Sequence, residues 1–256
     1  MSEAFFEDDF DTFKPETWEV KGSHTNFNVS VSDGWLHMIF NRQSSEPGPR
    51  YTWASVCTRT PLDLSNKTVQ VRFDLTPKQL QPSLPVFPYY VGVMLANKKD
   101  LQGHPFMAPD IDLKGVIYCL RMGLLTPIDK RAVVFDRGVI ATYPGAAFIQ
   151  FPPSEYEVSV GLTKVITYEL GVEDLTIPLP ADPTNLYIHL FVFHVEGIDY
   201  ILPSRASFDY IRVAKAPAAI EYPKPEQVLA STLQQVLPAM MVILMISTML
   251  SLLRRV

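Results

Sequence analysis

Apolar and polar residues alternate along much of the chain between residues 28 and 213. In the clearest case, Val69–Leu75, every second residue is apolar, and the residues between them are Gln70, Arg72 and Asp74. A period of two residues is typical of a strand that packs one face on a core. Similar runs predict further strands at Asn28–Val31, Trp35–Asn41, Tyr89–Ala96, Gly115–Met122, Ala132–Asp136, Phe148–Phe151, Val165–Leu170, Leu186–Glu196 and Ser207–Val213. No helix of more than two turns is predicted before residue 225, so we expect an all-β protein.

Turn-forming residues separate these runs. Asp33–Gly34 lies between two of them and predicts a tight hairpin turn. The proline clusters Pro82–Pro85 and Pro178–Pro180 predict loops or sheet edges, because proline cannot donate a hydrogen bond to a strand ladder. The 22 prolines outnumber the 12 glycines, and this composition favours strands joined by loops over a helical protein.

The predicted strand Leu186–Glu196 is apolar on both of its faces. A strand with water on one side would alternate, so we expect this strand to be central, with a cover on each face. Tyr187, His189, Phe191 and Phe193 share one face and are the candidate ligand-binding residues, since aromatic rings can stack on sugars. Packing in the core is the competing interpretation, and we favour it.

The C-terminal end of the chain has a different pattern. Its apolar segment, Val236 to Leu253, has no charged residue and is apolar around the whole helical circumference. At about 1.5 Å per residue it spans roughly 27 Å, close to the hydrocarbon thickness of a bilayer. We therefore predict a transmembrane helix at residues 228–256, with a buried oligomerisation helix as the alternative. The residues expected to anchor it in lipid are Val236, Met240, Met241, Val242, Ile243, Leu244, Met245, Ile246, Met249, Leu250, Leu252 and Leu253.

The remaining terminal features concern how this anchor is attached and inserted. Residues 214–227 are rich in proline and alanine and predict a semi-rigid stalk between a sandwich at residues 1–213 and the helix. The acidic N-terminus lacks the features of a secretory signal, so we expect a single-pass tail inserted after synthesis. Arg254 and Arg255 are too few to set the orientation. The spacing of Ser247 and Ser251 fits both self-association and an unpartnered anchor.

Charge and cysteine content exclude some classes of protein. The net charge is −5 and the basic residues are scattered, so no nucleic-acid partner is expected. Cys57 and Cys119 lie far apart in sequence. A disulfide would require two strands to bring them together, and we favour two buried free thiols.

Short sequence motifs at both ends of the β region resemble those of a known family and are called the family-like sequences below. They are Asp8-Asp-Phe-Asp11, Trp18-Glu-Val20 and Val31-Ser-Asp-Gly-Trp-Leu-His37 at the start, and Ala206-Ser-Phe-Asp-Tyr-Ile-Arg-Val213 at the end. In this order they resemble the opening and closing strands of the concanavalin A-like lectin/glucanase sandwiches. The resemblance covers residues 5 to 215 and implies an antiparallel jelly-roll sandwich, while it implies little about function.

Members of that superfamily that cleave glycans carry carboxylates on one strand, usually as E-x-D-x-x-E. One acid then acts as nucleophile and another as proton donor. The nearest pairs here are Asp110/Asp112 and Glu155/Glu157, and Gly115 and Val160 stand where the third acid is required. We therefore expect solvated carboxylates at both pairs.

Candidate metal ligands are few. The acidic cluster Glu7, Asp8, Asp9 and Asp11 has oxygens that suit Ca²⁺, but it lacks the glycine-containing spacing of a dedicated loop. The five histidines show no ligand spacing, and the chain has neither a nucleophile elbow nor a phosphate-binding loop. We expect no metal and no cofactor.

These patterns lead us to expect a non-catalytic, membrane-anchored structural or adhesive protein, such as a viral coat protein. Its expected partners are the lipid bilayer, further copies of the chain or neighbouring structural proteins, and a glycan; its expected location is a membrane or virion. The virion interpretation rests on analogy. Two alternatives remain open: a membrane-tethered glycoside hydrolase or lyase with a divergent acid pair, and a tail-anchored host scaffold that binds a protein through its sheet edge.

Overall fold

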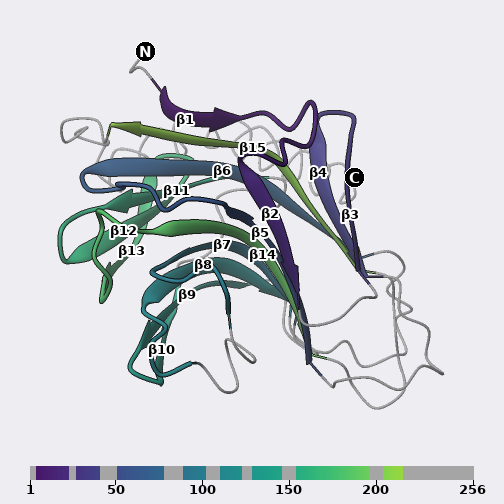
Figure 1. Cartoon of the computed structure of the whole chain (residues 1–256). Coiled ribbons are helices and arrows are strands. Elements are labelled where there is room, and N and C mark those ends of the chain that lie inside the picture. Colours follow the sequence, from purple (N-terminus) through teal and green to yellow (C-terminus); the bar gives the residue numbers. More distant parts are fainter. Residues whose placement is uncertain are drawn as a thin grey trace, which may run out of the picture. The chain divides into compact units, whose positions relative to one another are not determined.

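Two antiparallel sheets make up the part of the chain that the structure describes (Figure 1). This computed structural model describes residues 4–22, 27–40, 51–77, 89–101, 110–122, 129–145, 154–195 and 204–215. Within these ranges there are fifteen strands and no helix. The all-β prediction is therefore confirmed for this part of the chain.

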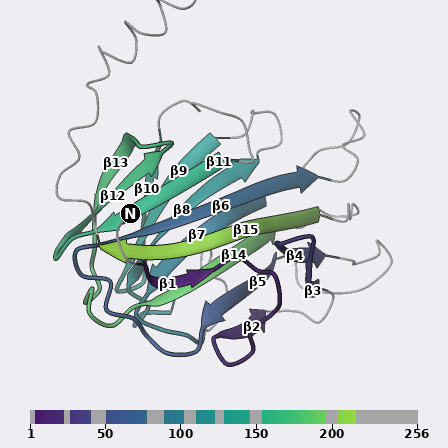
Figure 2. The same ribbon diagram turned by 90° about the horizontal axis from the view of Figure 1, so that it is seen from above.

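The eight-stranded sheet contains most of the family-like sequences of both ends, while Trp18–Val20 belongs to the other sheet. In Figure 2, seen from above, β6 and β15 run side by side through its middle. The strands follow the order β13 (Val172–Pro178), β12 (Lys164–Glu169), β11 (Ser154–Val160), β6 (Lys67–Pro77), β15 (Ser204–Lys215), β4 (Trp35–Phe40) and β3 (Phe27–Ser32), and β1 (Ala4–Asp8) pairs with the C-terminal half of β15.

The seven-stranded sheet contains the strand predicted to be central. That strand, β14, lies between β7 and β5 and pairs with both along most of its length. The order is β10 (Val139–Pro144), β9 (Asp129–Asp136), β8 (Gly115–Met122), β7 (Tyr89–Ala96), β14 (Tyr187–Val195), β5 (Tyr51–Thr58) and β2 (Trp18–Gly22).

Apolar side chains fill two separate clusters. The larger one lies between the sheets and includes Phe73, Tyr156, Leu190 and Phe208. A second cluster, on the other face of the seven-stranded sheet, is formed by Trp53, Met94, Ala96, Leu113, Ile117, Cys119, Val133, Phe135, Phe191 and Phe193. Strand β14 contributes to both clusters, and this explains why its sequence is apolar on both faces.

Three tight turns use the same backbone geometry. The residues of the predicted turn Asp33–Gly34 have φ angles of 56° and 72°, and β3 and β4 pair on either side of them. Two positive φ angles match the twist of the flanking strands and are expected of a two-residue hairpin. Arg137–Gly138 and Leu170–Gly171 repeat this geometry, although neither turn was predicted.

A buried carboxylate organises the N-terminal entry to the sandwich. Asp8 accepts hydrogen bonds from the Phe10 amide at 3.0 Å, from Lys14 Nζ at 2.8 Å and from Trp18 Nε1 at 2.6 Å. This explains the Asp-x-Phe sequence before a tryptophan strand, since the acid is the shared acceptor. The Asp8 carboxylate is thus engaged by protein donors, and the described residues contain no group of three or more side chains suited to a metal ion.

Most predicted strands are confirmed, and several others were missed. The run Phe148–Phe151 lies outside the described residues, as do the stalk from residue 216 onward and the predicted transmembrane helix. Within the described ranges, no helix has the length and apolar character to cross a membrane. Both cysteines are buried and free, as favoured from the sequence. The strands not predicted from alternation are β1, β2, β5, β10, β11 and β13.

Candidate functional site

The predicted ligand-binding residues lie together on the outer face of β14. Phe191 and Phe193 are buried in the second apolar cluster, His189 is fully buried and Tyr187 is half-buried. This packing follows the favoured core interpretation for the two phenylalanines. Contact of the four residues with a sugar stays a prediction.

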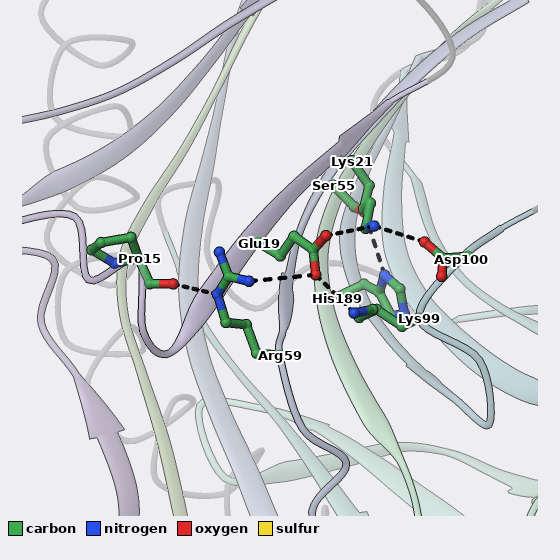
Figure 3. A network of polar contacts seen from close by, with 8 residues as sticks. All are labelled: Pro15, Glu19, Lys21, Ser55, Arg59, Lys99, Asp100 and His189. Carbon is green, nitrogen blue, oxygen red and sulfur yellow. Dashed lines mark hydrogen bonds and ion pairs between the residues drawn. The ribbon is translucent and has the colours of Figure 1, made fainter.

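His189 has polar partners on both ring nitrogens. Its Nε2 lies 2.9 Å from the carbonyl oxygen of Lys98, and its Nδ1 lies 3.3 Å from Ser55 Oγ (the His189–Ser55 pair appears in Figure 3). A carbonyl only accepts, so Nε2 carries the proton and Nδ1 accepts from the serine hydroxyl. Burial lowers the pKa of His189 to about 4, which keeps the ring neutral. The residue therefore anchors the segment after β7 and is unsuited to shuttle protons near neutral pH.

A network of ion pairs joins that same segment to the edge strand β2 (Figure 3). Glu19 on β2 lies 2.6 Å from Lys21 Nζ and 2.9 Å from Lys99 Nζ, and Lys21 also pairs with Asp100 at 2.7 Å. Hydrogen bonds from the two lysines lower the pKa of Glu19 to about 2. Because Glu19 stays ionised, it cannot donate a proton near neutral pH, and we interpret the network as structural.

The first predicted acid pair, Asp110/Asp112, lies in the turn before β8 and not on a strand. Lys98 Nζ is 2.6 Å from the carboxylate of Asp110 and 3.6 Å from that of Asp112. The Asp112 amide also donates to the side chain of Asp110 at 3.0 Å. The hydrogen bond from Lys98 lowers the pKa of Asp110, so this carboxylate, too, is held in its charged form.

The second predicted acid pair, Glu155/Glu157, differs in position and in electrostatics. Both residues lie on β11 and face outward, because Tyr156 and Val158 between and beside them are buried in the core. Gln70 on the neighbouring strand β6 donates a hydrogen bond to Glu157 at 3.0 Å. Burial, and secondly the charge of Glu155, nevertheless raise the pKa of Glu157. One carboxyl of this pair is thus displaced toward the protonated form.

A β-bulge in β15 brings Tyr210 to this pair and Asp209 to Arg72 on the strand between them. Phe208 pairs with Phe73 and Tyr210 pairs with Arg72, so Asp209 is the additional residue. Asp209 accepts a hydrogen bond from Arg72 Nη1 at 2.8 Å, while Tyr210 is hydrogen-bonded to Glu155. A bulge can redirect side chains in this way and is common next to active sites. No signal in the sequence predicted the bulge.

This arrangement has the elements of acid–base chemistry on a glycosidic bond. Residues two apart on a strand have Cα atoms about 7 Å apart and point to the same face. A pair in which one carboxyl is protonated and the other is ionised is the requirement for glycoside hydrolysis. The E-x-D-x-x-E pattern remains incomplete, because Val160 is buried in the core.

Comparison with known proteins bears on the fold. No protein-family model and no curated protein matches the sequence. One similar solved structure comes from a study of endo-acting O-glycanases that members of the human gut microbiota express to initiate mucin breakdown. It matches with a TM-score of 0.60 at 15% identity and covers 84% of this chain and 100% of that one. The chain has the concanavalin A-like sandwich fold. The resemblance at its two ends is therefore confirmed.

Two further solved structures give the same result. The β-glucanase of Bacillus licheniformis has a TM-score of 0.57 at 11% identity, covering 84% of this chain and 100% of that one. An immunostimulatory antigen and pseudo β-1,3-glucanase of Mycobacterium tuberculosis has a TM-score of 0.58 at 12% identity, with 84% and 99% covered. At these identities the likeness establishes the fold.

The matches contradict our expectation of a non-catalytic structural or adhesive protein, and with it the expectation that the chain is not an enzyme. Apart from the pseudo β-1,3-glucanase, the similar structures named here are described as glucanases and other glycanases, and the glycoside hydrolase that we kept as an alternative agrees with them better. The coat-protein interpretation rested on analogy between tail-anchored sandwiches and is dropped.

Proposed function

We propose that the protein is a glycan hydrolase whose acid pair is Glu155 and Glu157. The observation that carries the proposal is the raised pKa of Glu157 beside a second carboxylate on the same face of β11. General acids in glycosidases are carboxyl groups whose pKa is raised by their surroundings. The sandwich is shared with endo-acting glycanases, and this supports a glycan as the substrate.

In this mechanism Glu157 transfers its proton to the glycosidic oxygen as the bond from that oxygen to the anomeric carbon breaks. The carboxylate of Glu155 takes a proton from the attacking water, whose oxygen bonds to the anomeric carbon. Residues two apart on a strand have Cα atoms about 7 Å apart, and the water attacks the anomeric carbon from the side opposite to the leaving oxygen, in a single displacement with inversion. Tyr210, hydrogen-bonded to Glu155, orients the base.

The test is release of reducing ends from laminarin, mixed-linkage β-glucan and mucin O-glycans by the full chain. Glu155→Gln and Glu157→Gln each lower kcat/KM by about 100-fold or more. The matched controls Asp110→Asn and Asp112→Asn retain the rate of the wild type. Amide variants at 155 and 157 that cleave at the wild-type rate, or a wild-type chain that cleaves none of these glycans, would overturn the proposal.

We further propose that residues 236–253 cross a bilayer once and hold the sandwich at a membrane surface, with lipid as the partner. The support is the absence of charge over a length that matches the hydrocarbon core. The full chain then sediments with membranes, while a chain ending at residue 222 stays in the supernatant. If both remain in the supernatant, the segment is not an anchor. Cross-linking of the membrane-bound chain, compared with a Ser247→Leu/Ser251→Leu variant, tests self-association.

A further inference from the structure

The strands β11, β6, β15 and β4 are neighbours in the eight-stranded sheet (Figure 2). Their paired residues form a row of polar and aromatic side chains across these four strands. Glu155 pairs in register with Arg72, and Arg72 pairs with Tyr210. Leu36 pairs with Phe208, so the next residues along these strands, Trp35 and Asp209, lie beside each other. Three strand spacings amount to about 14 Å, which is longer than one pyranose ring.

Trp35 stands at the end of this row opposite to the acid pair. The Arg72 guanidinium lies 5.8 Å from the centre of its ring and also pairs with Asp209 at 2.8 Å. Trp35 is half-buried, whereas the other two tryptophans of the chain, Trp18 and Trp53, are 0% and 5% exposed. Trp35 is therefore the tryptophan whose indole surface is available to solvent, and Arg72 restricts the orientation of its ring.

We propose that Trp35 forms an aromatic subsite for a sugar unit of the chain whose glycosidic bond lies at Glu155 and Glu157. An indole ring offers a flat apolar surface that packs on the C–H face of a pyranose, and its N–H can bond a hydroxyl. This inference rests on the proposed hydrolase function. Because the row is longer than one sugar, the enzyme acts on internal bonds of a chain and requires an oligosaccharide that reaches from β11 to β4.

The charges of the row indicate the class of glycan. Glu155, Glu157 and Asp209 contribute three carboxyl groups. Of the two arginines on this face, Arg72 already pairs with Asp209, and Arg212 already pairs with Glu7. Like charges near a binding surface disfavour a partner strongly. The substrate is therefore an uncharged glycan, and uronic-acid or sulfated chains are excluded.

The distribution of the three tryptophans provides a direct binding measurement. Acrylamide quenching of fluorescence reports mainly on Trp35, since the other two side chains are buried. In the full chain carrying Glu157→Gln, which prevents turnover, laminarihexaose lowers the quenching constant at least by about half, the effect expected when one face of the indole is covered. A hexamer of alginate leaves the constant unchanged. Protection by alginate overturns the charge argument.

Kinetics separate a subsite from a structural role. Trp35→Ala raises KM for laminarihexaose about tenfold and leaves kcat within about twofold, because it removes stacking equally from ground and transition states. Cleavage of a short aryl glycoside is unchanged. The control Phe5→Ala removes another exposed aromatic side chain, near Lys67 at a distant end of the same sheet, and leaves both constants unchanged.

The outcomes distinguish this inference from the function on which it rests. Cleavage of laminarihexaose with no protection of Trp35, or with KM unaffected by Trp35→Ala, overturns the subsite and leaves the hydrolase intact. If laminarihexaose protects Trp35 but the wild-type protein cleaves no glycan, the subsite is supported and the proposed hydrolase function is overturned.

Discussion

Lys130 and Glu169 form an ion pair between the two sheets, with Nζ and Oε2 2.6 Å apart and side chains only 2% and 0% exposed. The Asp174 carboxylate lies 3.5 Å from the same ammonium group and accepts a hydrogen bond from the Tyr118 hydroxyl at 2.7 Å. This group of four side chains, Tyr118, Lys130, Glu169 and Asp174, thus connects β8 and β9 of one sheet with β12 and β13 of the other. Charges taken out of water in this way are tolerated only when they are paired and hydrogen-bonded.

The first prediction concerns loss of the lysine from this group. Lys130→Met leaves Glu169 and Asp174 without their shared cation and lowers the free energy of unfolding by about 3–5 kcal/mol. Urea denaturation measures this change. Lys164→Met, at an exposed position on β12, is the control and changes the free energy by less than about 0.5 kcal/mol.

A double variant checks that the loss arises from the pair. Lys130→Met/Glu169→Gln removes one charge of each sign, so it costs clearly less than the sum of the two single variants. Additive losses would show that Lys130 and Glu169 do not stabilise each other.

The sequence predicted the strands with the clearest apolar pattern, whether on one face or on both. Strand β6 alternates along its length, and β14 is apolar on both faces; both were found. Strand β11 was missed, because Glu155 and Glu157 have low strand propensity and resemble loop residues. The start of β9 was missed for a similar reason. Lysine is usually a surface residue, and the partners that allow Lys130 to be buried, Glu169 and Asp174, are distant in sequence.

The candidate site was less predictable than the fold. The sequence identified Glu155 and Glu157 as a pair, yet the distinction from Asp110 and Asp112 depends on burial and on neighbours from other strands. Gln70 and Tyr210 reach the pair through strand register and a bulge, which local sequence does not encode. The spacing of the acids therefore indicated where to look, and the environment of each carboxyl indicated which pair is suited to chemistry.

The second prediction is a loss of stability in acid that depends on His189. Its pKa is about 4 in the folded protein and 6.5 ordinarily, so the unfolded chain binds a proton first as the pH falls. The contribution of neutral His189 to the free energy of unfolding is fully present above pH 6.5. As the pH falls from 6.5 to about 4, the free energy of unfolding decreases by about 3 kcal/mol. Urea unfolding at pH 7, 5.5 and 4 measures this decrease. His189→Gln does not titrate, and its stability changes less over that interval; an unchanged pH dependence in this variant would assign the effect to other groups.

The third prediction compares two adjacent acids at the N-terminus. Asp8→Ala removes the acceptor shared by the Phe10 amide, Lys14 and Trp18 Nε1, and it lowers the free energy of unfolding by about 2–4 kcal/mol because buried donors lose their partner. Asp9→Ala, at the exposed neighbouring position, changes it by less than about 0.5 kcal/mol. Thermal unfolding of the two variants measures the difference. Equal effects would mean that the acidic cluster acts through its total charge.

The last prediction concerns the pKa of the proposed general acid. The Gln70 amide donates to the charged form of Glu157 and so opposes the increase in pKa caused by burial and by Glu155. In Gln70→Leu the pKa of Glu157 rises further, since the carboxylate loses a donor while it stays half-buried. The alkaline limb of the pH dependence of kcat/KM therefore moves to higher pH, because Glu157 remains protonated and active there.

Carbon-13 NMR of labelled glutamate follows the same ionisation without turnover. In Glu155→Gln the signal of Glu157 titrates at a lower pH than in the wild type, since the neighbouring negative charge is gone. Thr176→Val, on the edge strand β13, removes an exposed side-chain hydrogen bond away from the acid pair and leaves the titration unchanged. If the titration of Glu157 moves in neither Gln70→Leu nor Glu155→Gln, then burial and not these two neighbours sets its pKa, and the assignment of Glu155 as its partner is wrong.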